Sequence, residues 1–107
     1  MDISKLLQAK SLPEALQILV ELFQNTQFSK AGSVQIEADT GNYFFSLDKG
    51  LQLLDSLSNP DLKIVAKESV ILDLLKGKLA PPLALVLGKV KLFGDKSLMV
   101  QIKELLK

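Results

Sequence analysis

The chain opens with two segments whose apolar residues recur at helical spacing. Residues 2–10 predict a short amphipathic helix that begins at Asp2. A second helix should follow from Ser11 to about Gln24, because the sequence SLPE is a capping box with proline in the first turn. Its apolar positions form one wide stripe: Leu12, Ala15, Leu16, Leu19, Val20, Leu22 and Phe23.

The period then changes to two, which is typical of strands with one buried face. This alternation predicts strands over residues 34–38, 43–47 and 51–53. Turns around Gly41 and Gly50 separate them. The three strands therefore predict an antiparallel meander.

The second half of the chain mixes strands and helices. We predict a fourth strand over 61–67 and a helix over 69–77 that ends at a glycine. A double proline can begin a helix but cannot continue one, so a short helix is expected over 82–87. A fifth strand follows over 89–93, and Asp95 caps a last amphipathic helix.

Together these elements predict a single α+β domain over residues 1–107. The expected sheet has five strands, is mixed but mostly antiparallel, and carries its helices on one face. If strands 61–67 and 89–93 are neighbours, the helical crossover between them permits a parallel pair.

Composition narrows the function more by what it lacks than by what it contains. Of 107 residues, 48% are apolar and 23% are charged, with a net charge of +1, and there is no His, Cys, Trp or Arg. This balance argues against disorder and against nucleic-acid binding. Because Cys, His and Arg are absent, the chain has no thiolate, no imidazole and no guanidinium group that could clamp a carboxylate or phosphate. We therefore expect no catalytic residue, no metal site and no cofactor.

The segment GKLAPPLALVLGKVKLFGD, residues 77–95, is the most distinctive part of the sequence. It is not a phosphate-binding loop, because Gly88-Lys89 is followed by Val90 and no glycine stands at position 83. Its charge-free stretch, 79–88, is half the length of a membrane-spanning helix. Four lysines surround it, and they indicate either a solvated rim or a patch for anions or a membrane surface: Lys76, Lys78, Lys89 and Lys91.

Four successive elements of this half supply apolar side chains that could face one another. They are Leu75, Leu79, Leu83, Leu87, Val90, Leu92, Met99 and Ile102. A closed core uses the same residue types as the wall of a lipid pocket, so these residues alone leave both interpretations open.

The second half also resembles a known family. The stretch SNPDLKIVAKESVILDLLKGKLAPPLALVLGKVKLFGDKSLMVQIKELL is similar to the second half of the sterol carrier protein (type two) domain. The resemblance lies in two glycine-lysine pairs at a fixed spacing, a proline-led short helix and a strand that ends in glycine. The matching positions are Gly77-Lys78-Leu79, Pro81, Gly88-Lys89-Val90-Lys91-Leu92 and Gly94-Asp95.

The resemblance implies an apolar pocket or tunnel beneath the helices and a non-catalytic lipid carrier. The ligand would be a fatty acid, a fatty acyl-CoA, a sterol-like or another apolar molecule, and the eight residues above would line its pocket. The last helix would act as a roof that opens at Gly94, with Met99 and Ile102 pointing at the ligand.

Partners and location follow from the same resemblance. We expect a lipid ligand, no nucleic acid, and transient contact with a membrane surface or an enzyme. The chain ends in KELLK and not in a peroxisomal tripeptide, which we interpret as a stand-alone, prokaryotic, cytoplasmic member. The alternative function is a protein-protein interaction or homodimerisation module with a filled core.

Overall fold

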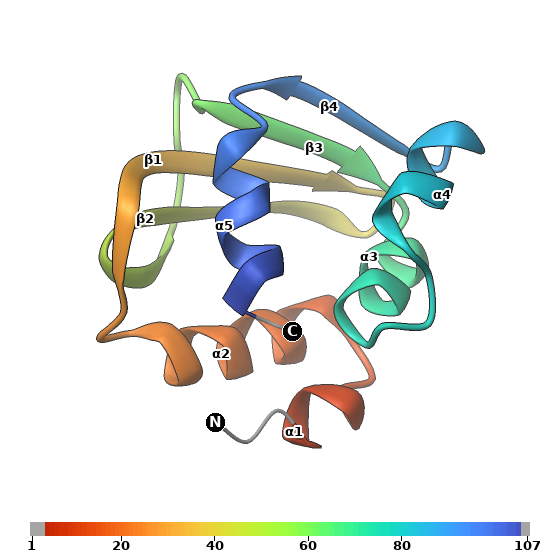
Figure 1. The fold of residues 1–107 in the computed structure, drawn as a ribbon, viewed down its shortest axis with the longest axis horizontal. Coiled ribbons are helices and arrows are strands. Elements are labelled where there is room, and N and C mark those ends of the chain that lie inside the picture. The colour runs from red at the N-terminus through yellow and green to blue at the C-terminus, as the bar shows by residue number, and fades with distance from the viewer. Residues whose placement is uncertain (1–3, 106–107) are drawn as a thin grey trace.

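The computed structural model describes residues 4–105 (Figure 1). The helices are α1 (Ser4–Leu7), α2 (Leu12–Phe23), α3 (Glu68–Leu75), α4 (Pro81–Val86) and α5 (Ser97–Leu105). The strands are β1 (Gln27–Ala38), β2 (Gly41–Leu54), β3 (Leu62–Ala66) and β4 (Val90–Gly94). The predicted helix cap Asp2 and the predicted apolar positions Ile3 and Leu106 lie outside the described residues.

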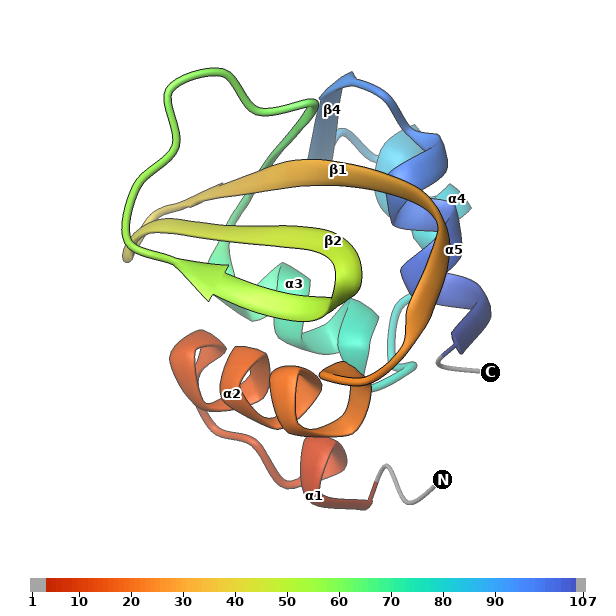
Figure 2. The ribbon, with the colours of Figure 1, turned by 90° about the vertical axis from the view of Figure 1, so that its left-hand side faces the viewer.

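The strands form one mixed sheet in the order β2-β1-β3-β4. β1 pairs antiparallel with β2 and parallel with β3, and β3 pairs antiparallel with β4. The helices lie on one side of the curved sheet, with α2 against β2 and α5 against β1 (Figures 1 and 2). The predicted α+β class, with a mixed sheet and helices on one face, is confirmed.

All five predicted strand segments are extended, but two of them belong to the same strand. Residues 43–47 and 51–53 are successive parts of β2, so the sheet built by residues 4–105 has four strands. The predicted turn at Gly50 is a bend within β2, where φ is +99°. A Cβ atom at Gly50 would lie 1.8 Å from the Gln24 carbonyl oxygen, so the bend is also a point of close contact with the end of α2.

The expectation of a parallel pair between the fourth and fifth predicted strands is wrong. β3 and β4 are antiparallel, with Leu62 opposite Gly94 and Ala66 opposite Val90. The parallel pair is β1 with β3, in which Val34 lies opposite Leu62. The connection between these two parallel strands consists of β2 and the loop after it, and it contains no helix.

The helix boundaries agree with the capping signals. The Ser11 hydroxyl oxygen accepts a hydrogen bond from the Glu14 N–H at 3.3 Å, as a capping box requires. The Glu14 carboxylate accepts the Lys10 N–H at 3.1 Å instead of returning to Ser11. Gly77 follows α3 with φ of +77°, and Ala80 precedes α4, which begins one residue earlier than predicted.

The buried side chains form one cluster between the sheet and the helices. Its largest fully buried members are Phe23, Leu6, Leu12, Leu47, Leu62, Leu98 and Val34. No polar or charged residue is buried among the described residues. The interior of the fold is therefore entirely apolar.

A candidate lipid-binding cavity

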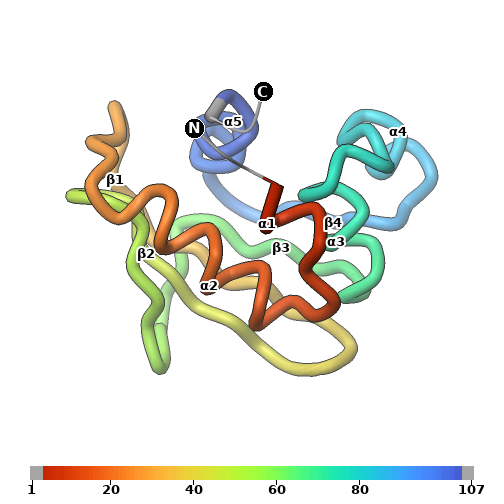
Figure 3. Tube along the Cα trace, turned by 90° about the horizontal axis from the view of Figure 1, so that it is seen from below, coloured from red at the N-terminus to blue at the C-terminus, as the bar shows by residue number. Residues whose placement is uncertain are grey.

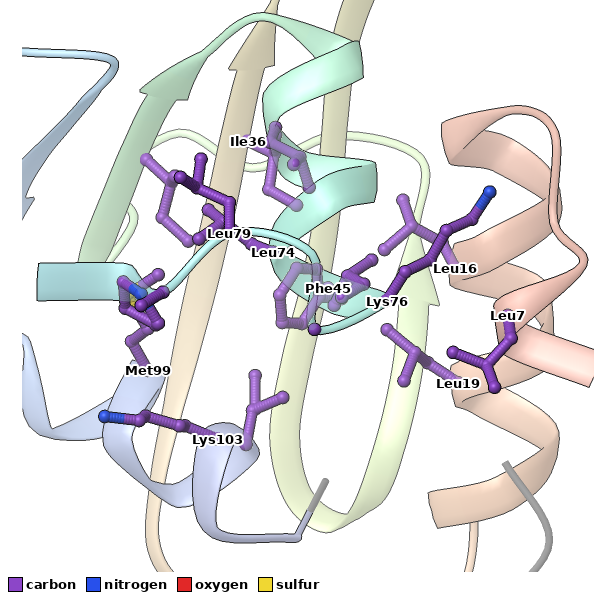
Figure 4. Close-up of a pocket in the computed structure, with 17 residues that line it drawn as sticks. Leu7, Leu16, Leu19, Ile36, Phe45, Leu74, Lys76, Leu79, Met99 and Lys103 are labelled. Carbon is purple, nitrogen blue, oxygen red and sulfur yellow. The ribbon is translucent and has the colours of Figure 1, made fainter. Parts of the chain in front are cut away.

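An apolar cavity of about 430 Å³ lies between the sheet and helices α2, α3 and α5 (Figure 4). Every strand except β4 contributes to its wall, as do the loop after α3 and the side of α5. The lining comprises Leu7, Leu16, Leu19, Ile36, Phe45, Ile64, Ile71, Leu74, Leu75, Lys76, Gly77, Leu79, Ala80, Pro81, Met99, Ile102 and Lys103.

The floor of the cavity follows from strand alternation and pairing. Ile36 of β1 and Ile64 of β3 lie opposite each other in the parallel ladder, so both project to the same face of the sheet. Phe45 of β2 completes the floor, and all three side chains are buried. Opposite them, Leu16 and Leu19 come from the apolar stripe of α2, one helical turn apart.

Among the described residues, the two charged ones that line the cavity, Lys76 and Lys103, lie at its mouth. Gly77, Ala80 and Lys103 are exposed, so the cavity opens to solvent there. Lys76 reaches along the mouth from the end of α3 (Figure 4). A site with an apolar wall and cations only at its rim fits a ligand with an apolar body and an anionic or polar head.

Four of the sequence-predicted site residues come together at this cavity. Leu75 and Leu79 line it from α3 and the loop that follows, and Met99 and Ile102 line it from α5. All four are half-buried and pack against the core. Their role in ligand binding stays a prediction.

The other four predicted residues lie elsewhere. Leu83 and Leu87 belong to the α4 segment and are exposed. Val90 is buried in β4, and Leu92, also on β4, is half-buried opposite Ile64. None of the four is part of the cavity wall.

The wall also contains residues that we did not name as site residues from the sequence. They come mainly from the first half of the chain: Leu7, Leu16, Leu19, Ile36 and Phe45. Their period marked them as core positions, and no pattern separates a core position from a cavity position. The family resemblance is carried by the second half of the chain and gives no signal for α2 or the β1-β2 hairpin.

Helix α5, the predicted roof, is held to the start of β1 by polar contacts. The Gln101 carboxamide accepts hydrogen bonds from the Ser29 hydroxyl and the Lys30 N–H, both at 2.8 Å, and donates to the Lys30 carbonyl at 2.9 Å. Asp95 forms an ion pair with Lys30 and accepts the Ser97 N–H at 3.0 Å. These interactions fix the first turns of α5.

The same contacts perturb one carboxyl group. Hydrogen bonds from Lys30 and Ser97 lower the pKa of Asp95 from 3.8 to about 2. Gly94, which we expected to act as a hinge, has φ of +106°, and a Cβ atom there would lie 2.2 Å from the Asp61 carbonyl oxygen. Gly94 is therefore in close contact with Asp61, the residue before β3, and the opening of α5 stays a prediction.

Other chemistries find little support in residues 4–105. No cluster of three or more carboxylates, histidines or cysteines that could hold a metal ion occurs among them. No helix in this part of the chain is long and apolar enough to cross a membrane. The geometry thus describes a small α+β domain whose distinguishing feature is an apolar cavity with a cationic rim.

Comparison with known proteins agrees with that description. The model of the SCP-2 sterol transfer family matches residues 5–107, and the chain belongs to this family. The recognition made from the two glycine-lysine pairs is confirmed. No curated protein matches the chain.

Solved structures with the same fold include both a large enzyme and small sterol carrier proteins. The stereoselective inverting sec-alkylsulfatase Pisa1 from Pseudomonas sp. superposes with a TM-score of 0.71 at 17% identity, over 87% of this chain and 15% of the sulfatase. The sterol carrier protein domain 2 of Helicoverpa armigera gives 0.63 at 22% identity, over 85% of this chain and 81% of that one. Palmitated SCP2L2 from Aedes aegypti gives 0.56 at 20% identity, over 99% and 95% of the two chains.

These identities establish a shared fold and nothing finer. This chain spans about 15% of the length of the sulfatase structures it matches.

Proposed function

We propose that this domain is a non-catalytic carrier that binds the acyl chain of a single lipid in the cavity. The observation that supports this proposal is the composition of the cavity wall. Its described residues are apolar apart from Lys76 and Lys103, and both of these lie at the mouth. An acyl chain would occupy the interior, and its carboxylate or phosphate head would remain at the lysine rim. A sterol or another apolar molecule is compatible with the same wall.

The volume supports occupancy by a ligand. A site of about 430 Å³ falls in the lower part of the range of ~300–1,000 Å³ typical of small-molecule pockets. Left as a closed void it would cost on the order of 10 kcal/mol at ~24 cal/mol per Å³. That cost is comparable to the whole stability of a small domain, which is about 5–15 kcal/mol. An open mouth and a lipid guest both remove this penalty.

The expected affinity is moderate. Each buried methylene contributes about 0.8 kcal/mol, so a sixteen-carbon chain gains roughly 12 kcal/mol before costs. Association and ordering remove about 4 kcal/mol or more. Micromolar binding with broad specificity follows, which suits a protein that must release its ligand to a membrane or an enzyme. The residues of 4–105 that line the cavity include no carboxylate or hydroxyl, which supports carriage over catalysis.

Displacement of a fluorescent fatty acid by palmitate from the delipidated protein tests the proposal. Leu79→Asn places an amide in the wall and should weaken binding at least tenfold, whereas Leu53→Asn changes an exposed residue outside the cavity and should not. Circular dichroism checks that both variants are folded. Absence of binding at micromolar protein, or equal affinities of the two variants, would contradict the proposal.

The cavity also favours a carrier over an interaction module with a filled core. Light scattering on the delipidated protein provides the comparison. A stable dimer that takes up no lipid would support the interaction module instead.

A further inference from the structure

Helix α4 buries one side and exposes the other. Ala84 is fully buried, and its carbonyl accepts the Lys89 N–H at 2.9 Å, which closes the C-terminal end of the helix. Four large apolar side chains of the helix and its C-terminal cap are exposed: Leu83, Leu85, Val86 and Leu87. Val86 is 83% exposed. Such a concentration of exposed apolar side chains on one short helix indicates a contact surface.

Lysines flank both ends of this helix. Lys76 and Lys78 precede it, Lys89 and Lys91 follow it, and residues 74–94 contain no Asp or Glu. None of the four lysines forms an ion pair with a described residue. We call Lys78, Lys89 and the four exposed apolar residues the α4 surface. It combines an apolar centre with a local excess of positive charge.

The two carboxylates that lie beside Lys89 and Lys91 already have partners. Glu37 and Asp39 line a shallow depression together with Lys89 and Lys91. However, Glu37 forms an ion pair with Lys63 at 3.3 Å. The Asp39 carboxylate accepts the N–H of Glu68, the first residue of α3, at 2.8 Å. Both carboxylates already have partners outside the α4 surface.

The α4 surface adjoins the mouth of the cavity. The segment that joins α3 to α4 lines the cavity through Lys76, Gly77, Ala80 and Pro81. Figures 1 and 3 show α4 at the edge of the molecule, away from α2 and α5. A large planar partner could therefore contact α4 without disturbing the core.

We propose that the α4 surface docks this protein onto an anionic lipid bilayer. The exposed leucines and valine enter the boundary between headgroups and acyl chains, and the lysines contact anionic headgroups. A second copy of the chain is a poorer partner, because a symmetric dimer through this surface would place the lysines of one copy against those of the other. Docking brings the cavity mouth to the bilayer. Transfer of a lipid there rests on the proposed function, but the docking itself does not.

Flotation with phosphatidylcholine vesicles, prepared with and without phosphatidylglycerol, tests the docking. The wild-type protein should float with the anionic vesicles only and be released by added salt. Val86→Glu should abolish flotation because it places a carboxylate at the centre of the surface. Val100→Glu is the matched control, since Val100 is exposed on α5 away from α4, and it should float like the wild type.

The lysines are tested in pairs of equal charge change. Neutralising Lys78 and Lys89 together, each to Gln, should reduce partitioning about 25-fold, because each lysine near an anionic surface contributes about fivefold. The same changes at Lys10 and Lys49, which are exposed elsewhere, should have little effect. Equal losses in the two pairs would indicate nonspecific attraction and overturn the assignment to α4.

Other outcomes separate this inference from the proposed function. Failure to float, equal losses in Val86→Glu and Val100→Glu, or a dimer that Val86→Glu dissociates would each overturn the docking surface. Displacement of a fluorescent fatty acid is measured on the same samples, and Val86→Glu should retain wild-type affinity because Val86 is not part of the cavity. Flotation without fatty-acid binding would reject the carrier and retain the docking, and the reverse result would reject the docking alone.

Discussion

Replacing Met99 and Ile102 together with Ala distinguishes a cavity wall from an ordinary core. Both side chains are half-buried on α5, and both line the cavity. Full burial of such a side chain contributes about 1.5–3 kcal/mol, so half-burial gives about 1 kcal/mol each. No close-packed void forms, because the adjacent space is already open. The lipid-free double variant should therefore lose only about 2 kcal/mol of unfolding free energy.

Ligand affinity should change more than stability relative to wild type. The two substitutions remove apolar contacts on one side of the lipid, and we expect at least a tenfold rise in Kd, equivalent to about 1.4 kcal/mol. If the two residues were core, each change would cost about 2–5 kcal/mol, and their sum would approach the stability of the domain. The two interpretations thus differ by several kcal/mol.

Urea unfolding of the delipidated protein, followed by circular dichroism, measures the stability difference. Leu98→Ala is the matched control on the same helix. Leu98 is fully buried, and a Cβ atom at Gly32 would lie 2.6 Å from its side chain, so this variant should lose about 2–5 kcal/mol yet keep its affinity for lipid. A double variant less stable than Leu98→Ala, or one with wild-type affinity, would refute the assignment of Met99 and Ile102 to the cavity wall.

Three further predictions concern the scaffold. Because the pKa of Asp95 is lower in the folded state, its ionised carboxylate stabilises the fold above pH 3.8, and this contribution is lost as the pH falls toward 2. In Asp95→Asn, the unfolding free energy measured in urea should therefore change less with pH across that window. Gly50→Ala should destabilise far more than Gly77→Ala in thermal melts, because both glycines have positive φ but only a Cβ at Gly50 would meet backbone, 1.8 Å from the nearest atom. Ser11→Ala should lower the unfolding free energy by about 1 kcal/mol, as measured in urea, through loss of the α2 cap.

Each of these has a clear contrary result. A pH profile of Asp95→Asn parallel to that of the wild type would show that the ion pair with Lys30 is not maintained in solution. Equal melting temperatures for the two glycine variants would contradict the close approach of β2 to the end of α2. A Ser11→Ala variant as stable as the wild type would mean that Glu14, through its bond to the Lys10 N–H, suffices to hold the start of the helix.

The sequence by itself determined most of the local structure. The capping box placed the start of α2, alternation identified part of every strand, and glycine positions marked the ends of α3 and α4. These signals are local, because hydrogen bonds and side-chain periods are set within a few residues. The two glycine-lysine pairs, with the proline-led helix and the strand that ends in Gly94, also allowed the family to be recognised. Of the predicted site residues, Leu75, Leu79, Met99 and Ile102 reach the cavity.

Only the tertiary structure decided how the elements are arranged. Alternation shows which face of a strand is buried but not which strand lies beside it, so the parallel β1-β3 pair was missed. A buried position in α2 or β2 has the same residue types whether it meets another side chain or an empty space, so Leu16 and Phe45 could not be separated from the core. The apolar residues of the α4 segment show the opposite case. Its apolar sequence is typical of a buried helix, yet Leu83 and Leu87 are exposed and Ala84 is fully buried. Whether an apolar side chain fills the core, lines a cavity or faces solvent depends on which elements pack above it, and that is a property of the whole fold.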